Sequence, residues 1–134
     1  MPHLVILYTA HLDRDTDMSA LCRTLADTML SVRDEADQQV FPTGGVRVLA
    51  YPAAHSAVAD GKGDYGFVYL NLRMAAGRSA AVKQRAGDAL TAATGAHFAE
   101  LLARSPLGIT LQIDEGAEVY NGKHSTLHPL FNKA

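Results

Sequence analysis

Three residues in this chain are of types that can move a proton and hold an anion. Pro2 follows only Met1 and opens an apolar run, PHLVILY, over residues 2–8. If Met1 is removed, Pro2 carries a secondary amine, whose pKa lies far below that of a lysine and near that of an α-amino group. When neutral, such an amine is a usable general base, whereas with Met1 attached the nitrogen is an amide without a basic lone pair. Arg47 and Arg78 are the other two residues, because guanidinium groups bind carboxylates through paired hydrogen bonds.

The pattern of apolar residues predicts the elements that position these side chains. Strands are expected over residues 2–9, 46–51, 65–73 and 109–114, and helices over residues 18–32 and 80–102. Residues 11–17 are expected to form a polar connection that ends in Asp17 as a helix N-cap. The order is strand–helix–strand twice within a single domain, in units of about residues 2–51 and 65–114, followed by a tail over residues 115–134.

These elements predict an α+β fold in which duplicated βαβ units form one four-stranded sheet with both helices on one face, because each crossover is right-handed. The strands of a βαβ unit start at the same sheet edge, which brings Arg47 near Pro2. If the two units run antiparallel, the end of the third strand brings Arg78 to that edge as well. Two guanidiniums there would hold an anion, stabilise a developing enolate and lower the pKa of the amine.

The first and third predicted strands are apolar on both sides. In the first, Leu4 and Ile6 point to one face while Val5 and Leu7 point to the other. Strands of this kind are buried on both faces, yet the chain predicts only two layers. We therefore expect another subunit to cover the face away from the helices. The tail over residues 115–134 is the alternative cover, although it offers little apolar mass.

Composition limits the class and the compartment of the protein. The chain has 134 residues, of which 48% are hydrophobic and 19% charged, with a net charge of −2. This balance gives no electrostatic reason to bind nucleic acid or a membrane surface, and no apolar stretch approaches the length of a membrane span. A single cysteine, Cys22, cannot form an internal disulfide. Together with the lack of a leader-like segment, this predicts a cytoplasmic protein.

Two groups of residues imitate metal sites. The run DRDTD over residues 13–17 is spaced like a calcium loop, but Met18 and Thr24 occupy the positions of the required glycine and glutamate. His124 and His128 have the spacing of zinc ligands on a helix, without a third ligand nearby in the sequence. We therefore predict packing and capping roles for these residues, no metal and no cofactor.

The opening segment, PHLVI over residues 2–6, resembles the tautomerase superfamily, whose members use an N-terminal proline as acid–base catalyst on a trimer of duplicated βαβ units. The resemblance is closest to the 5-carboxymethyl-2-hydroxymuconate isomerases. It covers nearly the whole chain, in the segments FPTGGVR (41–47), ADG (59–61), DYGFV (64–68), GRS (77–79) and LHPLF (127–131). The main departure is the lengthened connection over residues 33–39.

The resemblance implies a homotrimeric, cofactor-free isomerase that converts a 2-hydroxymuconate-type dienol carboxylate into its 2-oxo isomer, in the breakdown of a homoprotocatechuate-like aromatic. It implies Pro2 as the acid–base catalyst. It also implies that Arg47 and Arg78 bind the carboxylates of a di- or tricarboxylate and polarise its carbonyl. His3 and Tyr69 are further candidates for lining the cleft, with packing as the alternative role. A dehalogenase or decarboxylase of a small acid, and a non-catalytic trimeric binding protein, are the alternative functions.

Overall fold

The computed structural model describes residues 2–131, so Met1, whose removal the proline chemistry requires, lies outside the described residues. The strands are β1 (His3–Thr9), β2 (Arg47–Ala53), β3 (Gly66–Ala75) and β4 (Leu107–Gly116). The helices are α1 (Leu12–Asp15), α2 (Met18–Ser31), α3 (Ala80–His97) and α4 (Ala99–Arg104), with the 3₁₀ turns η1 (Thr43–Gly45) and η2 (His128–Leu130). None of the described helices combines the length and the apolar character needed to cross a membrane.

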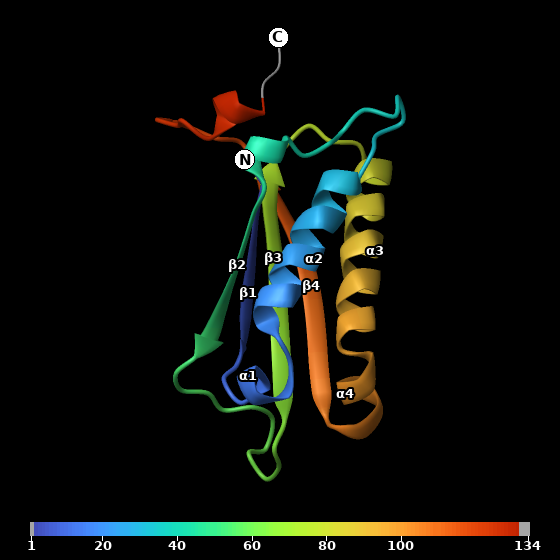
Figure 1. Ribbon diagram of the computed structural model, residues 1–134, viewed down its shortest axis with the longest axis vertical. Helices are drawn as coiled ribbons and strands as arrows, with labels where there is room; N and C mark the ends of the chain where they lie inside the picture. Colours follow the sequence, from blue (N-terminus) through green and yellow to red (C-terminus); the bar gives the residue numbers. More distant parts are fainter. Residues whose placement is uncertain (1, 132–134) are drawn as a thin grey trace.

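The four strands form one sheet in the order β2–β1–β3–β4. β1 is parallel to β2 and antiparallel to β3, while β3 is parallel to β4. Both long helices, α2 and α3, cover the same face of the sheet (Figure 1). The predicted α+β fold of two βαβ units is therefore confirmed. The starts of β1 and β2 and the ends of β3 and β4 meet at one edge, where His3 pairs with Arg47 and Arg73; we call this the N-terminal edge.

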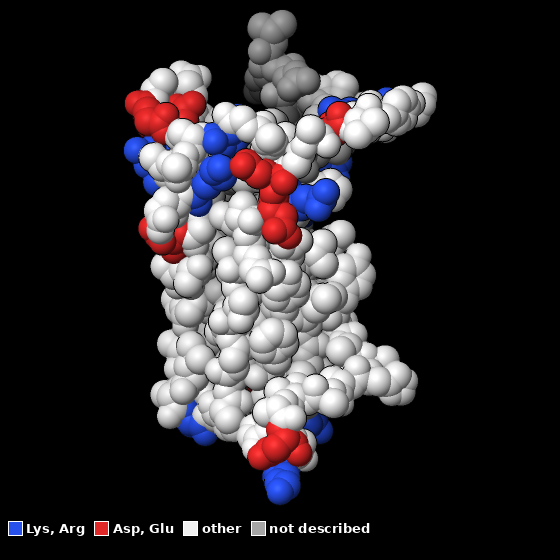
Figure 2. Space-filling model, turned by 180° about the vertical axis from the view of Figure 1, so that it is seen from behind, with Lys and Arg blue, Asp and Glu red and all other residues white. Residues whose placement is uncertain are grey.

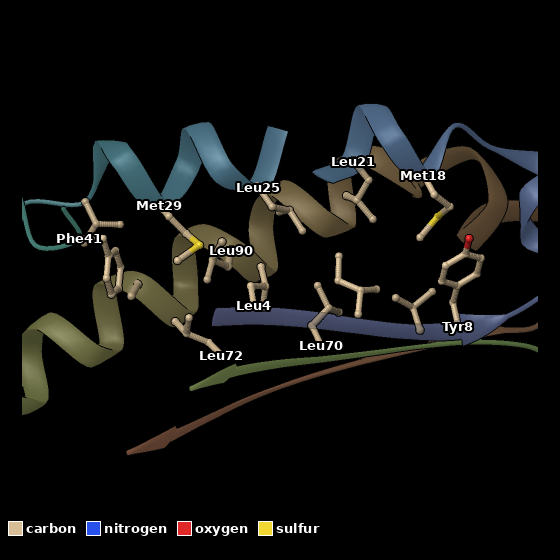
Figure 3. Close-up of a cluster of buried hydrophobic side chains, with 14 of the residues drawn as sticks. Leu4, Tyr8, Met18, Leu21, Leu25, Met29, Phe41, Leu70, Leu72 and Leu90 are labelled. Atoms are coloured by element: carbon tan, nitrogen blue, oxygen red, sulfur yellow. The ribbon is translucent and has the colours of Figure 1, made fainter. Parts of the chain in front are cut away.

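The core lies between the sheet and the two long helices. Alternate residues of β1 and β3 point toward the helices, and Leu21, Leu25 and Met29 recur at helical spacing on the facing side of α2. Burial of each such side chain stabilises the fold by about 1.5–3 kcal/mol. Asp17 caps α2 as predicted, because its carboxylate accepts the Ala20 N–H at 3.0 Å. The fully buried side chains labelled in Figure 3 include Leu4, Leu21, Leu25, Met29, Leu70, Leu72 and Leu90.

The structure differs from the sequence prediction in two helical segments. Residues 11–17, expected to be a polar connection, contain the short helix α1, which buries Leu12. The helix expected over residues 80–102 is divided at Phe98 into α3 and α4. At Phe98 the backbone (φ −97°, ψ 11°) departs from α-helical geometry. The break turns the chain so that Phe98 and Leu101 are both buried.

The face of the sheet away from the helices is uncovered in the single chain. Leu7, Leu49 and Tyr51 are 45–50% exposed on this face, and Phe67 is 37% exposed. Seen from this side, charged side chains gather toward the two ends of the molecule and leave an uncharged band between them (Figure 2). The tail over residues 117–131, the alternative cover for this face, leaves these residues exposed.

Candidate active site at the N-terminal edge

Pro2 lies immediately before β1 and is buried. The next residue, His3, pairs with Arg47 of β2 on one side and with Arg73 of β3 on the other. Neighbouring strands lie about 4.8 Å apart, so Pro2 is flanked closely by the start of β2 and the end of β3. The parallel pairing of β1 and β2 therefore places Pro2 and Arg47 at the same edge of the sheet.

The turn η1 orients the side chain of Arg47. Its Nη1 donates hydrogen bonds to the carbonyl oxygens of Gly45, at 2.9 Å, and Gly44, at 3.3 Å. These contacts fix a positive charge beside the start of β1. Burial, followed by the charge of Arg47, lowers the pKa of His3, so the imidazole next to Pro2 is neutral at pH 7.

Arg78 reaches the same end of the molecule from the loop between β3 and α3. Gly77 before it has a φ of +113°, which side-chain-bearing residues rarely adopt. Ser79 after it caps α3 by accepting the Val82 N–H at 3.2 Å. The Nη2 of Arg78 donates to the Val40 carbonyl at 2.9 Å, and the guanidinium has no other partner within residues 2–131. The start of α3 adds the positive potential of its unpaired N–H groups.

The lengthened connection over residues 33–39 is attached to the start of α3. The hydroxyl of Ser79 donates a hydrogen bond to the Glu35 carboxylate at 2.8 Å. The same segment leads directly into Val40, whose carbonyl holds Arg78. The connection over residues 33–39 therefore bears on how Arg78 is positioned.

Within a single chain, Tyr69 lies away from the N-terminal edge. It pairs with Leu7 on the uncovered face, and its hydroxyl donates to Oε1 of Gln112 at 2.6 Å. It lies four residues along β3 from Arg73, which corresponds to about 14 Å at the rise of a strand. A role for Tyr69 beside Pro2 would therefore require a neighbouring subunit.

The C-terminal tail also contributes to this edge, at a position that the sequence did not predict. η2 packs against η1 so closely that a Cβ on Gly44 would lie 3.0 Å from Cα of His128 and 3.4 Å from the ring of Phe131. The imidazole of His128 hydrogen-bonds Ser125 at 2.8 Å. Burial, followed by nearby cations that include Arg47, lowers the pKa of His128. The tail thus supports the turn whose carbonyls orient Arg47.

Sequence reasoning also missed Arg73. A cavity of about 530 Å³ opens on the uncovered face at the N-terminal edge, and its lining includes His3, Asn71, Arg73 and Tyr120. The antiparallel arrangement that pointed to Arg78 applies equally to the last residues of the third strand, so this signal was available. Pro2 is not among the residues that line this cavity.

Residues 2–131 contain no group of three or more His, Cys, Asp or Glu side chains that could hold a metal ion. The acidic run near α1 makes other contacts. Asp13 accepts a hydrogen bond from the Tyr8 hydroxyl at 2.6 Å, and Asp17 caps α2. The guanidiniums of Arg47 and Arg73 at the N-terminal edge, with Arg78 in the loop after β3, are groups that suit organic anions, although Asp114, Glu115 and Glu118 also lie near this edge.

Comparisons of the sequence and of the structure with known proteins point to the same family. The sequence profile of the 5-carboxymethyl-2-hydroxymuconate isomerase family matches residues 2–131. A 5-carboxymethyl-2-hydroxymuconate Delta-isomerase from Escherichia coli is 29% identical over 131 residues, which are 98% of this chain and 99% of the relative. A crystal structure of a 5-carboxymethyl-2-hydroxymuconate delta-isomerase is 59% identical with a TM-score of 0.95, covering 100% of this chain and 95% of the other. The corresponding isomerase from Deinococcus radiodurans R1 is 34% identical with a TM-score of 0.86, covering 98% and 95%.

More distant solved structures share the tautomerase fold alone. They include a macrophage migration inhibitory factor-like protein from Entamoeba histolytica, 12% identical with a TM-score of 0.59. A fused 4-OT, described as a symmetric trimer, is 18% identical with a TM-score of 0.56.

Proposed function

Because this chain belongs to the 5-carboxymethyl-2-hydroxymuconate isomerase family, we propose that it converts a 2-hydroxymuconate-type dienol carboxylate into its 2-oxo unsaturated isomer, without a cofactor. The observation that carries the proposal is the register of β1 with β2, which sets the guanidinium-bearing Arg47 beside His3, the residue after Pro2. A potential base and a fixed cation at one edge match the needs of a reaction that passes through an enolate.

In the processed chain, the Pro2 nitrogen is the acid–base catalyst. The neutral amine accepts the proton of the 2-hydroxyl group, which leaves a dienolate and a pyrrolidinium. The dienolate then forms the C2 carbonyl, its double bonds shift, and a carbon of the chain takes the proton from the pyrrolidinium. The reaction therefore moves one proton from oxygen to carbon and regenerates the amine. Burial of Pro2 and the nearby charge of Arg47 both disfavour the ammonium relative to the neutral amine.

Arg47 and Arg78 bind the anionic groups of the substrate. Each guanidinium can form paired hydrogen bonds with a carboxylate, and each is oriented by backbone carbonyls, Arg47 by η1 and Arg78 by Val40. Their charge also stabilises the oxygen of the dienolate as it forms. His3 beside Pro2 forms a polar wall of the cleft, and the lowered pKa of its imidazole favours the neutral form.

The active form is proposed to be a homotrimer in which each chain is one domain. The uncovered band that contains Leu7, Leu49, Tyr51 and Phe67 is the contact surface between copies, because its burial removes large apolar side chains from water. A neighbouring copy would also enclose Pro2 and could bring its Tyr69 to the cleft. We place this trimer in the cytoplasm, with Cys22 as a free thiol, in the catabolism of a homoprotocatechuate-like aromatic.

The test is the ultraviolet absorbance of 5-carboxymethyl-2-hydroxymuconate, followed with and without the protein. We expect accelerated loss of the dienol in the wild type and a strong reduction in Arg47→Met. Arg104→Met is the matched control, since Arg104 ends α4 at the opposite end of the sheet, and it should keep full activity. Saturable binding of the dienol without turnover would instead indicate a binding protein. Release of halide or carbon dioxide from small acids, without dienol turnover, would indicate one of the other activities.

A further inference from the structure

The cavity on the uncovered face contains an arginine to which the proposed mechanism gives no role. Arg73 is the eighth residue of the ten-residue strand β3, and its side chain is exposed to this cavity of about 530 Å³. Its guanidinium extends over the end of β4, where a Cβ on Gly116 would lie 4.0 Å from Nη2. The amide of Asn121 and the phenol of Tyr120 belong to residues that line the same cavity.

Arg73 has no hydrogen-bond or ion-pair partner within the part of the chain that the structure describes. The carboxylate opposite it in register is Asp114, but Oδ2 of Asp114 accepts a hydrogen bond from the Asn71 amide at 2.7 Å. Glu118 also lines the cavity and is engaged in an interaction of its own. Arg73 therefore differs from Arg47 and Arg78, which are both tied to backbone carbonyls.

The position of Arg73 is related to the candidate active site by the sheet itself. His3 pairs with Arg47 on one side and Arg73 on the other, so the two arginines lie on the strands that flank β1. At the spacing of neighbouring strands, their Cα atoms are about 10 Å apart. Long guanidinium side chains at that separation can hold different carboxylates of a single six-carbon diacid with a branch.

On these grounds we propose that Arg73, assisted by Asn121, binds the third carboxylate of the substrate, the one carried by the carboxymethyl branch. This inference rests on the proposed isomerase function and goes beyond it. It assigns two carboxylates of the muconate chain to Arg47 and Arg78, and the branch to the cavity at Arg73. Arg73 is then the residue that favours a tricarboxylate over a dicarboxylate dienol.

The test compares two dienols, 5-carboxymethyl-2-hydroxymuconate and 2-hydroxymuconate, with the full-length processed protein. In Arg73→Met, kcat/KM for the tricarboxylate should fall at least about tenfold, mainly through KM, because a charged hydrogen bond to the branch is lost. For the dicarboxylate, kcat/KM should change less than about twofold. Arg73→Lys keeps the charge and should recover part of the loss. Arg104→Met, which removes an arginine at the opposite end, should affect neither substrate.

Several outcomes would overturn the inference. An equal loss for both dienols in Arg73→Met and Arg73→Lys, with the sedimentation coefficient unchanged, would assign Arg73 a general rather than a branch-specific role. Unchanged kcat/KM for the tricarboxylate would remove Arg73 from substrate binding. In both cases the wild type still turns over the dienols, so the proposed function stands. If the wild type turns over neither dienol, the proposed function fails, and this inference fails with it.

Discussion

A single methyl group on Gly44 should uncouple the C-terminal tail from Arg47. Gly44 is buried in η1, and its carbonyl accepts a hydrogen bond from Arg47 Nη1 at 3.3 Å. The backbone of Gly44 does not need a positive φ, so alanine has no conformational penalty there. Its Cβ would lie 3.0 Å from Cα of His128, which is tighter than a normal contact with backbone. Either η2 or η1 must therefore move in Gly44→Ala.

The loss of stability in Gly44→Ala depends on whether η1 or η2 moves. Overpacking costs about 1–3 kcal/mol, and because η2 contains no buried residue the tail can yield. We therefore expect a loss of about 1 kcal/mol in the free energy of unfolding. Once η2 is displaced it no longer supports η1, so the carbonyls that orient Arg47 are held less firmly, and this has a separate effect on catalysis. A weakened charged hydrogen bond to substrate costs about 1.5 kcal/mol, which corresponds to about a tenfold decrease in kcat/KM.

The assay combines urea denaturation with dienol turnover, and Gly95→Ala is the matched control. Gly95 lies within α3, and a Cβ there would meet no atom within 4 Å. Replacing a glycine within a helix by alanine stabilises the folded state by about 0.5–1 kcal/mol. Gly95→Ala should therefore be more stable than the wild type and equally active. Wild-type kcat/KM in Gly44→Ala, or a comparable decrease in Gly95→Ala, would refute the link between the tail and Arg47.

Three further predictions concern the site, the assembly and the pH dependence of stability. Arg78→Ala should raise KM for the dienol about tenfold, through the loss of a charged hydrogen bond; an unchanged KM would exclude Arg78 from substrate binding. Leu49→Asp should shift sedimentation toward a monomer, whereas Leu102→Asp, equally exposed on α4, should not; equal behaviour of the two would contradict the proposed interface. Burial lowers the pKa of His97 in the folded state, so stability should be full above about pH 6.5 and decline as the pH falls below it, because the unfolded chain then binds more protons. His97→Gln should flatten this decline in urea denaturation between pH 5 and 7.5, and an identical slope would contradict the assignment.

Most of the sheet could be predicted because its sequence signals are local and agree with one another. β1 is a continuous apolar run from Leu4 to Leu7, which is typical of a buried strand, while Leu21 and Leu25 recur at helical spacing on the buried side of α2. Given two βαβ units, the parallel pairing within each unit follows, and with it the position of Arg47 beside the start of β1. The site residues on strand starts were therefore accessible to sequence reasoning.

The remainder depended on tertiary contacts that leave no local pattern. The helix breaks at Phe98, whose aromatic side chain is buried. The apolar residues before and after Phe98 keep a helical spacing, so the sequence shows no sign of the break. The tail carries no periodic signal, so its packing on Gly44 could not be anticipated. Tyr69 is a candidate for the cleft in the sequence, whereas the register places it about 14 Å from Arg73 along β3.

The central claim is that the Pro2 nitrogen accepts and returns the transferred proton, and it is tested most directly by the state of the N-terminus. A preparation that keeps Met1 is divided, and one half is treated with a methionine aminopeptidase. Intact mass spectrometry then gives the processed fraction, and the dienol assay gives the turnover of each sample. We predict turnover in proportion to the processed fraction and almost none in the untreated half, because an amide nitrogen has no basic lone pair. Full turnover from a preparation that carries Met1 on every chain would contradict the account.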